Sequence, residues 1–222
     1  FLDFRRGEGT AITNEEDFTS EAEIKREQQR LDSPDILAIK GLGQFQRFKA
    51  ASAFRSLIES WHVSDFHISA ARGSQDAGYA EHLSPDGANL PLVTQFMFEK
   101  HRKSFDKVLD AMARRVPGVE KVEAQLTTDG RVVLRFQDGA YQDPFIARFV
   151  SDGTIKMFAY LVLLHDPTPH PLLCIEEPEN QLYPMLLGEL AELGDGRLRE
   201  GAQAGADEQV GAQLLAGPHD LD

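Results

Sequence analysis

The sequence predicts an α/β fold, and three features support this class. The first is a helix over 155–164, in which apolar residues recur at helical spacing and surround most of the cylinder. The second is the apolar run from Leu172 to Ile175, which has the length of a buried strand. The third is a β-hairpin, because apolar residues alternate on both sides of the turn signal Asp129-Gly130.

The composition limits the class of protein. The chain has 222 residues, 41% of them hydrophobic, which is enough for a substantial core. The net charge of −13 argues against a broad nucleic-acid-binding surface but permits a local basic patch. The single cysteine, Cys174, rules out an intramolecular disulfide and is expected to be a small buried residue in a reducing cytoplasm. No apolar run approaches the ~18 residues of a membrane helix, and the start at Phe1 leads us to expect a piece of a longer protein.

The first third of the chain is expected to be mainly helical. Residues 1–19 are polar and irregular, and 20–31 are expected to form an exposed helix capped by Ser20. A stronger helix is predicted over 44–61, followed by a strand over 63–71. The apolar residues of that helix have the spacing of a buried stripe: Phe54, Leu57, Ile58 and Trp61. His62 and His67 flank Asp65, a pattern open to metal binding, although structural histidines are the commoner interpretation.

A loop over 72–91 precedes a long helix over 92–115 that ends at Pro117-Gly118. The basic side of this helix could contact phosphate or DNA, although a solvated face is the commoner interpretation. Its basic residues are His101, Arg102, Lys103, Lys107, Arg114 and Arg115. After the hairpin, a third strand over 145–149 is expected to lead directly into Ser151.

The segment Ser151-Asp152-Gly153-Thr154 begins the apolar helix. Ser151 is a natural N-cap, and Gly153 lets backbone approach a ligand closely. A helix N-terminus with a serine hydroxyl and free N–H groups suits an anionic phosphate.

Two adjacent acids, Glu176 and Glu177, follow the apolar strand. Neighbouring side chains on extended backbone point in different directions. One carboxylate can therefore hold Mg²⁺ while the other faces an attacking water, as phosphoryl transfer requires.

The order SDGT, apolar helix, Pro-rich turn, apolar strand and EEPEN-x-L-x-P resembles the C-terminal half of an ABC-type P-loop ATPase head. The similar group is that of the soluble SMC/RecF-like predicted AAA-family ATPases. The resemblance implies that SDGT is the signature motif, the strand with its acids is Walker B, and 180–184 is the D-loop. Ser151, Asp152, Gly153 and Asn180 would then contact nucleotide, with Ser151 and Gly153 serving the γ-phosphate held by a partner subunit. Glu176 would take the magnesium side, and Glu177 would be the general base.

The resemblance also sets the expected domain organisation. A helical insertion lobe is expected over 1–118, and an ATPase core that includes the β-hairpin over 119–193. The third segment, 194–222, is a Gly/Ala-rich tail without a convincing switch histidine. No G-x-x-x-x-G-K-[ST] occurs in the sequence, and in the family this phosphate loop precedes the region that resembles this chain.

The expected function is ATP binding and hydrolysis, with Mg²⁺, by a head-to-tail dimer of such heads. The dimer would drive a DNA-associated repair or defence assembly, with DNA or an effector protein as a further partner and no membrane contact. The alternative is a non-catalytic scaffold or regulatory module derived from such a head.

Overall fold

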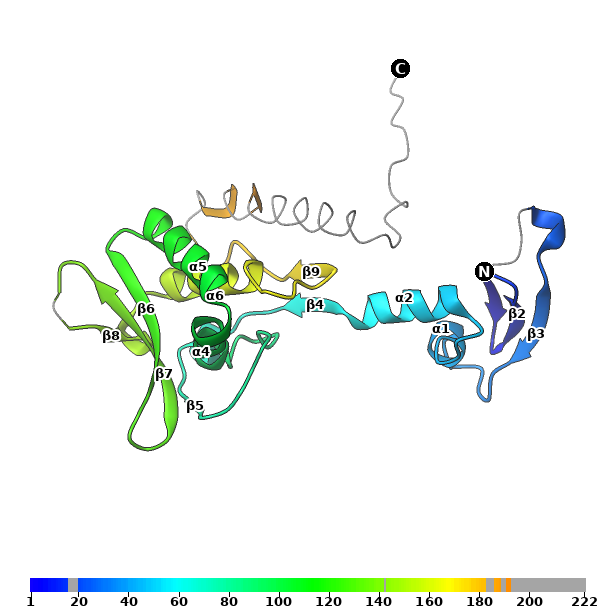
Figure 1. The fold of residues 1–222 in the computed structure, drawn as a ribbon, viewed down its shortest axis with the longest axis horizontal. Coiled ribbons are helices and arrows are strands. Elements are labelled where there is room, and N and C mark those ends of the chain that lie inside the picture. The colour runs from blue at the N-terminus through cyan, green and yellow to red at the C-terminus, as the bar shows by residue number, and fades with distance from the viewer. Residues whose placement is uncertain (16–19, 142, 183–185, 189–190, 193–222) are drawn as a thin grey trace, which may run out of the picture. The chain divides into compact units, whose positions relative to one another are not determined.

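The computed structural model describes residues 1–15, 20–141, 143–182, 186–188 and 191–192. Two compact units make up the chain (Figure 1). Unit 1 comprises Phe1–His62 and His170–Cys174, and unit 2 comprises Val63–Pro169 and the described residues from Ile175 onward. Together they form a mixed α/β structure, as predicted.

Unit 1 begins with a three-stranded antiparallel sheet in the order β1 (Leu2–Arg5), β2 (Glu8–Ile12), β3 (Arg26–Arg30). The turn between β1 and β2 places Arg6 and Gly7 in the left-handed region, which suits a tight hairpin. The prediction of an irregular start and of a helix over 20–31 was therefore wrong. Only the 3₁₀ turn η1 (Glu21–Glu23) is helical there. The charges of β3 belong to an outer strand that pairs with β2, and charged side chains are common on such strands.

The helices of unit 1 are α1 (Ala38–Leu42) and α2 (Lys49–Glu59). They cover a small core formed by Ala11, Leu42, Phe48 and Ala51. The predicted helix over 44–61 is confirmed in its central part, but its predicted buried stripe is wrong. Phe54 is 50% exposed, Leu57 42% and Trp61 44%.

Two short strands each come directly before a segment of unit 2 in the chain. They are β4 (Trp61–Ser64) and β9 (Leu172–Ile175), and they pair as a two-stranded sheet. The strand predicted over 63–71 ends early, because the helix α3 (Ile68–Ala71) begins there. The prediction that β9 and Cys174 are buried was also wrong: Leu172 and Cys174 are exposed. Among the described residues β9 pairs only with β4, so one edge of the strand has no described neighbour.

Unit 2 contains two helices where one was predicted over 92–115. They are α4 (Leu90–Lys100) and α5 (Arg102–Arg115), and the chain leaves helical geometry at His101. Phe105, Val108 and Met112 are buried, which confirms the apolar face predicted for the second half. On the opposite side, Arg102 pairs with Asp106 at 2.8 Å, and Lys103 and Lys107 are exposed.

The hairpin is confirmed as β6 (Val119–Leu126) and β7 (Arg131–Asp138), with Val122 opposite Phe136 and Leu126 opposite Val132. The two-residue strands β5 (Gln75–Asp76) and β8 (Phe145–Ile146) also pair with β7. The predicted third strand becomes the 3₁₀ turn η2 (Ala147–Phe149) after Ile146.

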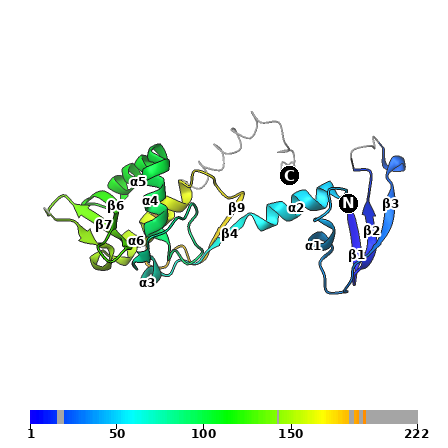
Figure 2. The ribbon, with the colours of Figure 1, turned by 60° about the horizontal axis from the view of Figure 1, so that its bottom comes forward.

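Helix α6 (Asp152–Leu164) is the centre of unit 2 (Figure 2). All ten residues from Ile155 to Leu164 are buried, as the apolar pattern predicted. The helix contacts α3, α4 and α5, and the Phe158 ring meets the Phe136 ring of β7 edge-on at 5.6 Å. The predicted helix after Pro184 and the 194–222 tail lie outside the described residues, apart from 186–188 and 191–192, which are helical.

Candidate functional site

One cavity of about 630 Å³ in unit 2 brings together segments that are far apart in the sequence. The start of α6 contributes Asp152 and Lys156, and the loop after β9 contributes Glu176, Glu177, Asn180 and Gln181. The third wall is the segment after β4, which includes Asp65, His67 and Arg72. Four of the six residues assigned from the sequence therefore line one cavity.

The two acids differ in backbone geometry. The N–H of Glu176 donates to the carbonyl of Ser64 at 2.8 Å, so Glu176 continues the pairing of β9 with β4. Glu177 has a φ of 42°, in the left-handed region that non-glycine residues seldom adopt. Both carboxylates are exposed at the cavity. The backbone therefore changes region between the two acids, which is compatible with different roles for their side chains.

Asn180 fixes the turn that follows the acids. Its N–H donates to the Glu177 carbonyl at 3.0 Å, and its Nδ2 donates to Oε2 of Glu177 at 3.3 Å. Asn180 thus contacts both the backbone and the carboxylate of Glu177. A role in orienting that carboxylate follows directly from these two contacts.

Ser151 is the N-cap of α6, as predicted. Its Oγ accepts from the Thr154 N–H at 3.2 Å and lies 2.8 Å from the Thr154 Oγ1. Ser151 does not line the cavity that holds the acids. Together with Thr154 it lines a second cavity of about 250 Å³ beside β7 and β8. Ser151 and Glu177 therefore face different spaces.

Another backbone segment does approach Gly153 closely, as the sequence predicted, but this segment belongs to the same chain and not to a ligand. A Cβ on Gly153 would lie 2.9 Å from the backbone oxygen of Gln181. The glycine therefore allows the loop of the acids to pack against the start of α6. The sequence-based interpretation, an approach to a ligand, is not needed to explain this residue.

Arg72 was missed by the sequence analysis. Its guanidinium pairs with the Asp152 carboxylate and donates to the carbonyl of Val150, so it holds the turn that contains Ser151. Its Nε is buried without a hydrogen-bond partner in the described part of the chain. No local pattern marked this arginine, because its partners, Val150 and Asp152, lie 78 and 80 residues away.

Lys156 was also missed, because it occupies one position in an otherwise apolar helix. It is only 3% exposed, and its Nζ donates to the backbone carbonyl of Glu177 at 2.9 Å. Burial lowers the pKa of the Lys156 ammonium, and the nearby acids Glu177, Glu179 and Asp65 oppose that shift. The ammonium also lies 5.6 Å from the centre of the Tyr160 ring, whose buried hydroxyl has its pKa raised mainly by desolvation.

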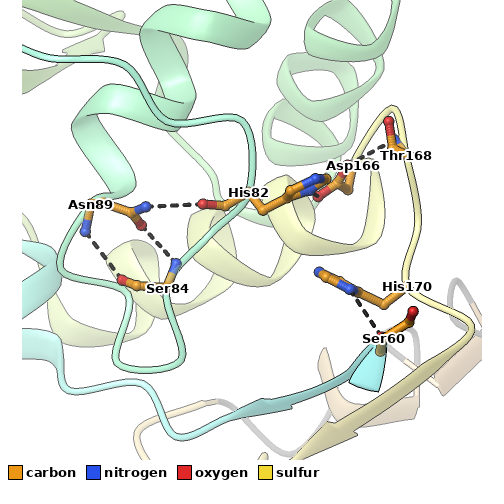
Figure 3. A network of polar contacts seen from close by, with 7 residues as sticks. All are labelled: Ser60, His82, Ser84, Asn89, Asp166, Thr168 and His170. Atoms are coloured by element: carbon orange, nitrogen blue, oxygen red, sulfur yellow. Dashed lines mark hydrogen bonds and ion pairs between the residues drawn. The ribbon is translucent and has the colours of Figure 1, made fainter. Parts of the chain in front are cut away.

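The histidines around Asp65 have separate surroundings. Within unit 2, His67 Nε2 lies 3.8 Å from Asp65 Oδ2, and both side chains are exposed. Within unit 1, His62 is buried and its ring stacks on that of His170 at 4.5 Å. His170 Nδ1 lies 3.3 Å from the carbonyl oxygen of Ser60 (Figure 3). The stacking of His62 favours a structural role for it.

Polar contacts order the long loop before α4 (Figure 3). Asn89 bridges this loop, because its Nδ2 donates to the His82 carbonyl and its Oδ1 accepts from the Ser84 N–H. The His82 ring contacts the buried carboxylate of Asp166 at 2.8 Å. The N–H of Thr168 donates to the same carboxylate. The contacts of Asp166 therefore join the loop before α4 to the segment that follows α6.

The cavity suits a divalent cation and an attacking water better than it suits a triphosphate. Carboxylate and amide oxygens are the ligands that Mg²⁺ prefers, and Glu176, Glu177 and Asn180 supply them. The two cations, Arg72 and Lys156, already contact Asp152 and the Glu177 carbonyl. The residues present therefore fit the metal and water side of a nucleotide site.

One comparison with known proteins identifies a family. A family model described as "AAA domain, putative AbiEii toxin, Type IV TA system" matches residues 6–215. No curated protein and no solved structure gives a significant match. Across the described residues, no helix combines the length and apolarity needed to cross a membrane. The match covers nearly the whole chain and confirms an ATP-binding AAA-type domain, whereas the finer SMC/RecF-like grouping stays a prediction. The chain therefore belongs to this AAA-domain family, and its domain is an ATPase domain.

Proposed function

We propose that the domain is the C-terminal lobe of an ABC-type head of the SMC/RecF-like group, which hydrolyses ATP between two copies arranged head to tail. The observation that carries this proposal is the shared cavity of Asp152, Glu176, Glu177 and Asn180. Two motifs about 24 residues apart converge there, and neither motif alone would support a nucleotide site.

Glu177 is the proposed general base. Its carboxylate is exposed at the cavity, and Asn180 orients it through Oε2. A water on the cavity side would lose its proton to this carboxylate as it attacks. Removing such a base typically lowers the rate by ~10²–10⁴-fold.

Glu176 is the proposed magnesium-side residue. Its backbone is held by Ser64, so its carboxylate leaves the end of β9 from a fixed position. Mg²⁺, when bound, would neutralise charge on the phosphates of ATP. Glu176 would hold it directly or through water, and Asn180 would lie beside it.

The separation of Ser151 from the acids supports the head-to-tail arrangement. Ser151 lines the smaller cavity, whereas Glu177 lines the larger one. A serine that faces away from its own base can serve the γ-phosphate held by a second copy. The family resemblance also assigns Asp152 and Gly153 to that nucleotide, but Asp152 lines the cavity of its own chain's acids and Gly153 packs against Gln181, so Ser151 is the residue proposed to reach it.

The proposed cellular role is that of an ATP-driven defence assembly. The family description refers to a type IV toxin–antitoxin system, which favours defence over DNA repair. An effector protein is the proposed partner, and the exposed lysines of α5, Lys103 and Lys107, are the candidate contact for DNA.

The test is Glu177→Gln in the full-length protein, with Glu179→Gln as the matched control. Glu179 belongs to the same loop but does not line the cavity. Glu177→Gln should lower kcat by ~10²–10⁴-fold, while ATP binding persists. It should also accumulate an ATP-bound dimer, measured by light scattering, whereas Glu179→Gln should behave as the unmutated protein.

Two outcomes would contradict the proposal. Hydrolysis at the unmutated rate by Glu177→Gln would place the base elsewhere. Absence of hydrolysis in the unmutated full-length protein, together with normal partner binding, would favour the scaffold alternative.

A further inference from the structure

The loop after β9 holds two non-glycine residues in the left-handed region. These are Glu177, with a φ of 42°, and Gln181, with a φ of 64°. Such backbone is strained and persists only where surrounding contacts hold it. Residues in such backbone cluster at active sites and ligand-binding sites.

Helix α6 touches both of these residues. Lys156 Nζ donates to the carbonyl of Glu177 at 2.9 Å, and Gly153 packs closely against the carbonyl of Gln181. Both contacts come from the first two turns of α6, directly after the cap residue Ser151. The start of α6 and the loop of the acids are therefore joined at two points.

Lys156 is an unusual residue for its position. Its neighbours on α6 from Ile155 to Leu164 are all buried and almost all apolar. An ammonium loses hydration there, so a methionine would satisfy the packing with less penalty. What the lysine adds is a charged donor to the carbonyl of the residue with the proposed catalytic carboxylate.

We propose that Lys156 is a positioning residue that couples the Ser151 end of α6 to the orientation of the Glu177 carboxylate. This inference rests on the proposed function. A phosphate that engages Ser151 pulls on the first turn of α6, and Lys156 transmits that displacement to the Glu177 backbone. The nucleotide that contacts Ser151 of a chain thereby controls the orientation of Glu177 in the same chain, although Glu177 acts in the other nucleotide site.

The first test needs no nucleotide. Lys156→Met in the full-length protein removes the ammonium and keeps an unbranched apolar side chain. Hydrogen exchange should become faster at the amides of Asn180 and Leu182, which donate to the carbonyls of Glu177 and Glu179. Tyr160→Phe is the matched control, because it keeps the ring beside Lys156, and it should leave this exchange unchanged.

The second test measures hydrolysis. Lys156→Met should lower kcat by ~10–100-fold with little change in the KM for ATP, as is typical when the support of a catalytic group is lost. Lys156→Arg, which restores a charged donor, should recover part of the loss. The melting temperature of Lys156→Met should not fall, because a buried charge has been removed.

Unchanged exchange of the loop in Lys156→Met would overturn the inference. If Lys156→Met lowers the melting temperature, Lys156→Gln takes its place, since its shorter amide does not reach the same carbonyl. Normal hydrolysis by Glu177→Gln would contradict the proposed function, and the exchange result would still stand by itself. Reduced hydrolysis by Glu177→Gln together with normal kcat in Lys156→Met would contradict this inference alone.

Discussion

Helices α6 and α2 both carry apolar side chains at helical spacing, but they differ in what covers those side chains. Every residue of α6 from Ile155 to Leu164 is buried. In α2, Phe54 and Leu57 are about half exposed, and Ala51 is the buried residue. The same periodicity therefore accompanies a core helix in unit 2 and a surface helix in unit 1.

The neighbours of the two helices explain the difference. Helix α6 packs against α3, α4 and α5, so most of its circumference meets protein. Helix α2 packs mainly against α1, which is one turn and a half long. Periodicity thus predicts a helix and its apolar face, whereas burial depends on which elements lie nearby.

The largest loss of stability is expected when a buried side chain of α6 is shortened. Phe158 is fully buried and contacts Phe136 edge-on, so Phe158→Ala removes a large ring from the core. The free energy of unfolding should fall by ~3–5 kcal/mol. Urea denaturation followed by circular dichroism measures this, and a loss below ~1 kcal/mol would mean that α6 is not the core of unit 2.

A smaller effect is expected where α6 meets the loop of the acids. In Gly153→Ala the new Cβ would lie 2.9 Å from the Gln181 carbonyl oxygen, so the backbone must shift. The free energy of unfolding should fall by ~1–3 kcal/mol. Gly188→Ala is the matched control, because nothing lies within 4 Å of its Cβ position. If the two variants were equally stable, the close contact between α6 and the loop at Gly153 would be contradicted.

The smallest effect is expected in α2. Leu57 is 42% exposed, so Leu57→Ser should lower the free energy of unfolding by only ~1 kcal/mol or less. The same denaturation measurement applies. A loss above ~2 kcal/mol would show that this face of α2 is covered in the native protein, and the contrast with α6 would disappear.

In the candidate site too, some residues could be recognised from their near neighbours in the sequence, whereas others depend on contacts with distant segments. Ser151, Asp152, Glu176, Glu177 and Asn180 could be named from the sequence, because each belongs to a short motif with its own chemistry. Arg72 and Lys156 could not be named, because the partners of Arg72 lie 78 and 80 residues away and that of Lys156 lies 21 residues away. A lone arginine after a short helix and a lone lysine in an apolar helix carry no local pattern.

The sequence by itself determined the features that depend on near neighbours. These are the cap at Ser151, the apolar helix after it, the hairpin around Asp129-Gly130 and the pair of acids after β9. The tertiary structure alone decided that 26–30 is a strand and that the α2 stripe is exposed. It also decided that Lys156 holds the Glu177 backbone. Each of these depends on a segment distant in the chain, and side-chain periodicity contains no information about which distant segment will pack or pair.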